Sequence, residues 1–291
     1  MDSSLRSRVA SLLDSEVVDA QPTSGGYSGS RRWVVSLDNG SSAFVKAAGR
    51  QDHTRVRLRE EARFYQSFQR SCTPELYAFE DDPESPLLIL EDLSHATWPP
   101  PWTTEHVDNV LDTLRQVAAE EPPEYLPSLE QYRETLSGWE RVEEDPSPFL
   151  GMGLATEAWL ESALPILKQA STEAVLAGPS LVHFDVRSDN LAFLTDRTVL
   201  VDWSIPAIGN PLADIVGWLP SLHVEGGPPP HEILGDEGSA LVALITGYWA
   251  SQAGLPPPKG APHVREVQRA QLEVSLPWTV RLLGLPAHSD E

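Results

Sequence analysis

The chain has 291 residues, 41% of them hydrophobic, which is enough for a substantial core in one large domain or in two lobes that share a cleft. Its 43 acidic residues outnumber its 21 Lys and Arg residues, and the formal net charge is −22. Because nucleic acids are bound by clustered basic side chains, this balance argues against a nucleic-acid partner. The excess acid either attracts a cationic ligand or only keeps the protein in solution.

Membrane insertion and disulfide bonding are also disfavoured. No apolar run approaches the roughly 20 residues that cross a bilayer, so no membrane partner is expected. The first 18 residues carry Asp2, Asp14 and Glu16 and predict a short amphipathic helix rather than a signal peptide. Cys72 is the only cysteine, which excludes an intrachain disulfide and a cysteine-based metal cluster. We expect a cytoplasmic protein.

The N-terminal third predicts a small antiparallel sheet with one helix inserted between its strands. Residues 17–48 contain three strand-like segments, and Asn39 with Gly40 is a strong hairpin turn between the second and the third. Residues 55–70 place apolar side chains mainly at helical spacing. Two further strands follow in residues 75–93, which gives the order β-β-β-α-β-β.

Beyond Ser94 the pattern becomes mostly helical, with long helical periods over 105–119 and 155–177. Two short strand-and-loop units interrupt the helices at 181–194 and 198–208. The fold expected is α+β with two lobes. Residues 1–93 form the small sheet lobe and residues 94–291 the larger, mainly helical lobe.

The segment HFDVRSDN at 183–190 has the pattern HxDxxxxN between apolar, strand-like residues. An aspartate at the position of Asp185 can accept a proton from a hydroxyl group, while Asn190 can reach a magnesium ion. Asp202 ends a second apolar run in VLVDWSIP. Asn190 and Asp202 would supply two oxygen ligands to one Mg²⁺ ion.

Lys46 ends the third predicted strand, and the following helix carries Glu60 and Glu61. A strand lysine held by a helix glutamate can neutralise nucleotide phosphates. Glu61 is favoured over Glu60 because it directly precedes the apolar ARFY turn. Taken alone, Lys46 would more readily be interpreted as a solvated lysine at a strand end.

Between the first two strands lies the glycine-rich segment SGGYSGS at 24–30. Gly25, Gly26 and Ser28 would let backbone amides approach phosphates closely. The segment does not match GxGxxG, and GxxxxGK[ST] does not occur in the chain. A plain hairpin turn therefore remains an alternative.

The order of these motifs resembles the aminoglycoside phosphotransferase and choline kinase family, which has a protein-kinase-like fold, over essentially the whole chain. The resemblance implies an enzyme that uses Mg²⁺ and transfers the γ-phosphoryl group of ATP or GTP to a hydroxyl of a small acceptor. It implies that Asp185 is the catalytic base, that Asn190 and Asp202 bind the metal, and that Lys46, paired with Glu61, binds phosphate.

The resemblance also implies contacts for the adenine and for the catalytic loop. The adenine would bind the backbone of the linker Ile89–Leu93, with Leu90, Glu91 and Leu93 as the contact residues. His183 would be a scaffold residue, and Asp214 in GNPLADI would brace the loop. Arg187 would meet the γ-phosphate, or else form a structural ion pair with Asp189 or Asp214. Phe184 and Asn210 depart from the glycine and the aspartate that are usual in the family.

Two alternatives concern the activity, and two classes of acceptor remain open. A protein kinase would need a longer segment between Asp202 and the GNPLADI brace at 209–215, so a small acceptor is favoured. A catalytically silent nucleotide-binding module is disfavoured because all the motif residues are present. The fourteen acids and three basic residues of 105–161 suit a cationic, polyamine-like antibiotic.

A choline-like alcohol, a sugar or a nucleoside is the other acceptor class. Four tryptophans would either line its pocket or pack in the core: Trp98, Trp102, Trp139 and Trp159.

Overall fold

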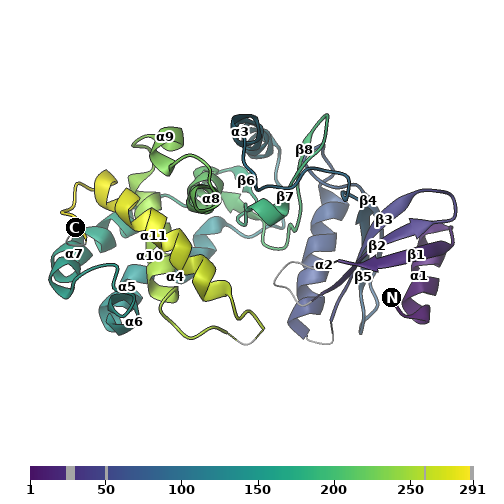
Figure 1. The fold of residues 1–291 in the computed structure, drawn as a ribbon, viewed down its shortest axis with the longest axis horizontal. Coiled ribbons are helices and arrows are strands. Elements are labelled where there is room, and N and C mark those ends of the chain that lie inside the picture. The colour runs from purple at the N-terminus through teal and green to yellow at the C-terminus, as the bar shows by residue number, and fades with distance from the viewer. Residues whose placement is uncertain (24–29, 50–51, 259, 289–291) are drawn as a thin grey trace. The chain divides into compact units, whose positions relative to one another are not determined.

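The computed structural model describes residues 1–23, 30–49, 52–258 and 260–288. It divides into two compact units, whose ribbons are drawn in Figure 1. The first unit is formed by residues 1–99 and 189–205, and the second by residues 100–188 and 206–291. The nucleotide-binding role of residues 1–93 and the acceptor role of residues 94–291 stay predictions.

The first unit is built on a five-stranded antiparallel sheet with the strand order β1-β2-β3-β5-β4. The predicted order β-β-β-α-β-β is confirmed, and an N-terminal helix precedes it. Gly40 has a φ of +87°, as the predicted hairpin turn requires. The elements of this unit are α1 Ser3–Leu13, β1 Val17–Pro22, β2 Arg31–Leu37, β3 Ser42–Ala47, α2 Asp52–Ser67, β4 Leu76–Glu80, β5 Leu87–Glu91, β7 Leu191–Phe193 and β8 Thr198–Leu200.

The two helices of the first unit lie on opposite sides of this sheet (Figure 1). Leu5 and Val9 of α1 pack in one hydrophobic cluster with the sheet residues Val45 and Ile89. Because successive side chains of a strand point to opposite faces, Lys46 projects from the face that Val45 does not occupy. The strand period thus places a lysine on the side of α2.

The β7–β8 hairpin belongs to the first unit although it lies far along the chain. Phe193 and Thr97 exchange two backbone hydrogen bonds of 2.9 Å each. Leu93, Ala192 and Val199 form a small buried cluster. The hairpin is therefore joined to the segment that follows β5 by both hydrogen bonds and apolar contacts.

The second unit is mainly helical, as predicted. The expected helices at 105–119 and 155–177 correspond to α3 and α7. Its elements are α3 Thr104–Ala119, η1 Leu129–Tyr132, α4 Arg133–Leu136, α5 Gly138–Glu144, α6 Ser147–Leu150, α7 Glu157–Glu173, β6 Ser180–Val182, β9 Ala207–Gly209, α8 Leu212–Val224, α9 Pro230–Leu234, α10 Ser239–Gln252 and α11 Val264–Leu282. The short 3-10 helix η2, Ser188–Asn190, spans the boundary between the units.

The antiparallel pair β6–β9 sets the geometry of the catalytic-loop candidate. Ser180 pairs with Gly209 and Val182 pairs with Ala207. The pairing places the residues that follow β6 beside those that precede β9. Among the described residues, no helix has both the length and the apolar character that a membrane crossing requires.

Candidate active site

Lys46 lies in a buried ion network in the first unit. Its Nζ atom is 2.5 Å from Oε2 of Glu61 and 3.2 Å from Oδ1 of Asp202. Lys46 and Glu61 are only 4% and 2% exposed. The network therefore joins a sheet strand, helix α2 and the segment after β8 through three charged side chains.

The charges of this network stabilise one another. Burial acts to lower the pKa of Lys46, but the attraction of Glu61 and Asp202 outweighs it, and the pKa is raised. The ammonium group therefore stays charged, as phosphate binding needs. Burial raises the pKa of Glu61 to about 7, although the ammonium group of Lys46 favours the charged form of the carboxylate. Removing one partner of such a buried pair costs about 3–5 kcal/mol, because the other charge is left uncompensated.

The two neighbouring glutamates of α2 have different environments. Glu60 is exposed and lies 3.9 Å from Arg57 on the same helix, whereas Glu61 contacts Lys46. The helix thus presents Glu61, and not Glu60, to the strand lysine.

Aromatic packing connects α2 to the segment that carries Asp202. The rings of Phe64 and Trp203 are stacked, with centroids 4.4 Å apart and an interplanar angle of 11°. Both side chains are fully buried. The Trp203 indole also donates a 2.8 Å hydrogen bond to the carbonyl of Leu200. Because Phe64 is about one helical turn beyond Glu61, this stack helps to set the position of Glu61 relative to Asp202.

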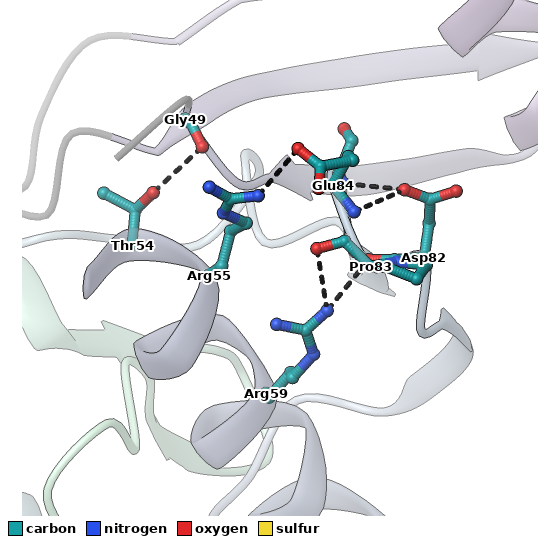
Figure 2. Close-up of polar contacts among 8 residues, drawn as sticks. Gly49, Thr54, Arg55, Arg59, Asp82, Pro83 and Glu84 are labelled. Atoms are coloured by element: carbon teal, nitrogen blue, oxygen red, sulfur yellow. Dashed lines mark hydrogen bonds and ion pairs between the residues drawn. The ribbon is translucent and has the colours of Figure 1, made fainter. Parts of the chain in front are cut away.

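Two arginines attach the exposed side of α2 to the turn between β4 and β5, as Figure 2 shows. Arg55 contacts the Glu84 carboxylate at 2.9 Å. Arg59 donates hydrogen bonds to the carbonyls of Asp82 and Pro83 at 2.9 and 3.3 Å. Helix α2 is therefore held both by the buried aromatic stack and by these surface contacts.

The predicted metal ligands Asn190 and Asp202 lie at one end of the β7–β8 hairpin. Leu191 pairs with Leu200, and the Val201 amide donates a 3.0 Å hydrogen bond to the Asn190 carbonyl. Asn190 thus precedes the first hairpin strand, and Asp202 follows the second. Asp202 has a φ of +61°, a left-handed conformation that aspartate tolerates better than most residues.

The chemistry of this pair fits a magnesium ion that is shared with a nucleotide. Amide and carboxylate oxygens suit a hard cation, and Mg²⁺ usually takes only one or two protein carboxylates together with substrate phosphates. Within the described residues, no group of three or more His, Cys, Asp or Glu side chains could hold a metal ion. A metal bound here would therefore need further oxygen ligands from the nucleotide and from water.

The remaining predicted nucleotide contacts differ in what the structure shows of them. Gly25, Gly26 and Ser28 lie outside the described residues. Leu90 is buried in β5. The Glu91 side chain contacts Arg197 at 2.5 Å and accepts a hydrogen bond from the Glu75 amide, so its carboxylate has a structural role.

The carbonyl of Leu93 already accepts hydrogen bonds from the backbone amide of Ala96 and from the indole of Trp98. A carbonyl oxygen has two lone pairs, and both of those on Leu93 are used by these bonds. An adenine contact at Leu93 would therefore use the backbone N–H group of this residue.

Asp185 lies in the second unit, in a loop fixed by backbone hydrogen bonds. The buried Asp214 carboxylate accepts hydrogen bonds from the amides of His183 and Phe184, at 2.9 and 2.7 Å. The Asp185 amide donates to Nδ1 of His183 at 3.2 Å. Burial raises the pKa of Asp214 to about 7, although the two amides favour its charged form. His183 and Asp214 thus have the surroundings of structural residues.

Arg187 contacts Asp185, a carboxylate that was not among the ion-pair partners proposed for it from the sequence. Its Nε atom is 3.4 Å from Oδ1 of Asp185, and its side chain is 22% exposed. This places a guanidinium beside the proposed base. The proposed role of Arg187 at the γ-phosphate stays a prediction.

Phe184 and Asn210, which differ from the related family pattern, have separate structural explanations. Phe184 has a φ of +65°, where glycine would be unstrained, and its ring packs against Tyr132 with centroids 5.3 Å apart. Asn210 donates a 2.8 Å hydrogen bond to the Val175 carbonyl and accepts one from the Leu212 amide. An ionised aspartate could not donate the first of these bonds.

Two of the four tryptophans that were proposed for a pocket or for the core lie in the core. Trp139 and Trp159 are buried, and their indole N–H groups donate to the carbonyls of Ala243 and Pro286. Trp98 is 36% exposed. Trp102 donates to Glu225.

Sequence reasoning missed two residues that contact the segments carrying the candidate side chains: Trp203, next to Asp202, and Glu225, which accepts a hydrogen bond from Ser188. Trp203 followed the metal-ligand candidate directly in the motif DW, so its position was a usable signal. Glu225 had no local signal, since its contacts come from distant segments.

A family model described as the phosphotransferase enzyme family matches residues 19–244. No curated protein matches the chain. Among solved structures, the chain is similar to a choline/ethanolamine kinase family protein from Mesorhizobium loti, with a TM-score of 0.55 and 13% identity over 97% of this chain and 94% of the other.

Two macrolide 2'-phosphotransferases are similar as well. The enzyme from Brachybacterium faecium has a TM-score of 0.52 and 15% identity, covering 99% of this chain and 95% of the other. A type I enzyme has a TM-score of 0.51 and 14% identity, covering 100% and 99%. At such identities the likeness shows a shared fold, and the predicted α+β kinase-like fold is confirmed.

The left-handed backbone at Phe184 gives a stability prediction. Phe184→Ala and Phe184→Gly remove the same ring, but only glycine adopts a φ of +65° without steric cost. The glycine variant should therefore be more stable than the alanine variant by about 1 kcal/mol in urea denaturation. An alanine variant of equal or greater stability would show that the positive φ stores no strain.

Proposed function

The chain belongs to the phosphotransferase enzyme family, and on that premise we propose that it transfers the γ-phosphoryl group of magnesium-bound ATP or GTP to a hydroxyl of a small molecule. The observation that carries this proposal is the contact of buried Lys46 with both Glu61 and Asp202. A lysine held between two carboxylates is positioned and charged, and so is suited to binding phosphate.

Each proposed step uses a group in the chain. Asp185 orients the acceptor hydroxyl and accepts its proton, while Lys46 binds the α- and β-phosphates. Asn190 and Asp202 would hold the magnesium ion, which neutralises phosphate charge when it is bound. Arg187, whose Nε atom lies 3.4 Å from Asp185, would stabilise charge on the transferred group. Phosphoryl transfer then depends mainly on positioning and on electrostatics.

The nucleotide contacts of the first unit follow from the same reasoning. The backbone of the linker at Leu90, Glu91 and Leu93 would bind the adenine, with the Leu93 N–H as one donor. Glu61 would act through Lys46 rather than on the phosphates. Gly25, Gly26 and Ser28 stay proposed phosphate contacts.

The acceptor is proposed at the level of chemical class. The acidic surplus of residues 105–161 favours a cationic hydroxylated compound, such as an aminoglycoside. The structural neighbours are named for macrolides and for choline or ethanolamine, so these alcohols are the next candidates. Transfer of radiolabelled γ-phosphate from ATP to aminoglycosides, macrolides, choline, ethanolamine, sugars and nucleosides tests the proposal. Transfer to none of them, with no phosphate release from ATP, would favour a silent nucleotide-binding module.

Replacing the proposed base should separate chemistry from nucleotide binding. Asp185→Ala should lower the turnover of magnesium ATP by about a hundredfold or more, because proton transfer and orientation are lost. The nucleotide affinity, measured by calorimetry, should change little. The control is Asp196→Ala, which alters an exposed acid in the β7–β8 turn. Turnover near that of the unmodified enzyme in Asp185→Ala would reject the assignment of the base.

Replacing the proposed metal ligand should change nucleotide binding, whereas replacing the proposed base should change turnover. Asp202→Ala should abolish the magnesium dependence of ATP binding, because a carboxylate ligand and a partner of Lys46 are lost together. Calorimetric titration of ATP with and without Mg²⁺ measures this effect. Asp196→Ala again serves as control and should keep the dependence. If Asp202→Ala responds to Mg²⁺ as the unmodified protein does, Asp202 is not a ligand.

A further inference from the structure

Glu225 binds two distant segments of the second unit with its two carboxylate oxygens. Its Oε1 accepts a 2.6 Å hydrogen bond from the Ser188 hydroxyl, and its Oε2 accepts a 2.9 Å bond from the Trp102 indole. Ser188 follows Asp185 by three residues. Glu225 is therefore in contact with the loop that carries the proposed base.

Helix α8 holds this loop at two points. Asp214, in the first turn of the helix, accepts the amides of His183 and Phe184. Glu225, the C-terminal cap residue of the same helix, accepts the hydroxyl of Ser188. Asp185 lies between the two anchored positions. At a rise of about 1.5 Å per residue, the two carboxylates emerge roughly 16 Å apart along the helix, a span that an extended loop segment can bridge.

The position of Glu225 is unfavourable for the helix itself. A negative charge at a helix C-terminus opposes the macrodipole, whereas the acid in the first turn, Asp214, agrees with it. Capping of α8 therefore does not explain a glutamate at this position. Its contacts with Ser188 and Trp102 offer a different explanation.

The second contact of Glu225 fixes the direction of the first. The Trp102 ring packs against Trp218 of α8, with centroids 5.6 Å apart, and Trp218 is fully buried. The indole N–H is thereby held in place and orients the Glu225 carboxylate. A carboxylate oriented in this way can restrict the rotamer of Ser188 and the backbone of the loop.

We propose that Glu225 is a positioning residue for phosphoryl transfer, acting through Ser188 on the loop that carries Asp185. The inference rests on the proposed function of Asp185 as the base. Glu225 does not touch the reacting groups in this role. Its effect is therefore expected in turnover rather than in nucleotide affinity.

The test is a double-mutant cycle read by phosphate release from magnesium ATP, with water as the acceptor. Glu225→Ala and Ser188→Ala should each lower kcat about tenfold to a hundredfold, because misplacement of a reacting group by about 1 Å costs that much. The double variant should lose no more than either single variant. The KM for ATP should stay within about twofold in all three, as for a change that affects only the reacting geometry.

A conservative replacement separates positioning from charge. Glu225→Gln can accept from the Trp102 indole with its oxygen and donate to the Ser188 oxygen with its amide, so it should restore most of the turnover lost in Glu225→Ala. Glu232→Ala, an exposed acid on α9, is the matched control and should not change kcat. Failure of Glu225→Gln to restore turnover would overturn the positioning role.

The remaining outcomes are distinguishable. If Glu225→Ala lowers only the melting temperature and keeps kcat, or if the losses of the two single variants multiply, the inference is overturned. If Glu225→Ala does not fold, Ser188→Ala and Glu225→Gln still decide the question, since they remove a hydroxyl or a charge alone. If Asp185→Ala keeps phosphate release in the same assay, the proposed role of Asp185 as the base is rejected, independently of the results for the Glu225 variants.

Discussion

A buried lysine must be compensated, and that requirement organises the first unit. Lys46 projects from the sheet face opposite the α1 cluster, and without anionic partners its charge would be costly. Glu61 and Asp202 supply the two partners at 2.5 and 3.2 Å. Because Glu61 comes from α2 and Asp202 follows β8, the lysine can be satisfied only when both elements are in place. The same arrangement leaves an ammonium group and a partly exposed carboxylate where a nucleotide phosphate and its metal could bind.

In the second unit, a single helix fixes the position of the loop that contains Asp185. Helix α8 carries Asp214 near its beginning and Glu225 at its end, and both carboxylates accept hydrogen bonds from the loop that contains Asp185. The loop includes Phe184 in a left-handed conformation, which such anchors can maintain against the local preference. In each unit, therefore, a proposed functional carboxylate lies in a short, fixed segment. Asp202 follows the β7–β8 hairpin in the first unit, and Asp185 lies in the loop held by the carboxylates of α8 in the second.

Much of this could be predicted from the sequence because the relevant signals are local. Lys46 could be located at the end of a predicted strand, and the apolar turn after Glu61 distinguished Glu61 from Glu60. The contacts between distant segments had no such signal. The stack of Phe64 on Trp203 and the bond from Ser188 to Glu225 depend on tertiary packing. The sequence likewise offered Asp189 or Asp214 as partners of Arg187, and it did not indicate the contact with Asp185, two residues away.

A crystal structure of the protein with magnesium and a non-hydrolysable ATP analogue tests the central claim most directly. The account predicts that Lys46 contacts the α- and β-phosphates, that Asn190 and Asp202 bind the metal ion, and that Asp185 faces the γ-phosphate. A nucleotide bound with its phosphates away from Lys46, or a metal ion held by other residues, would contradict it.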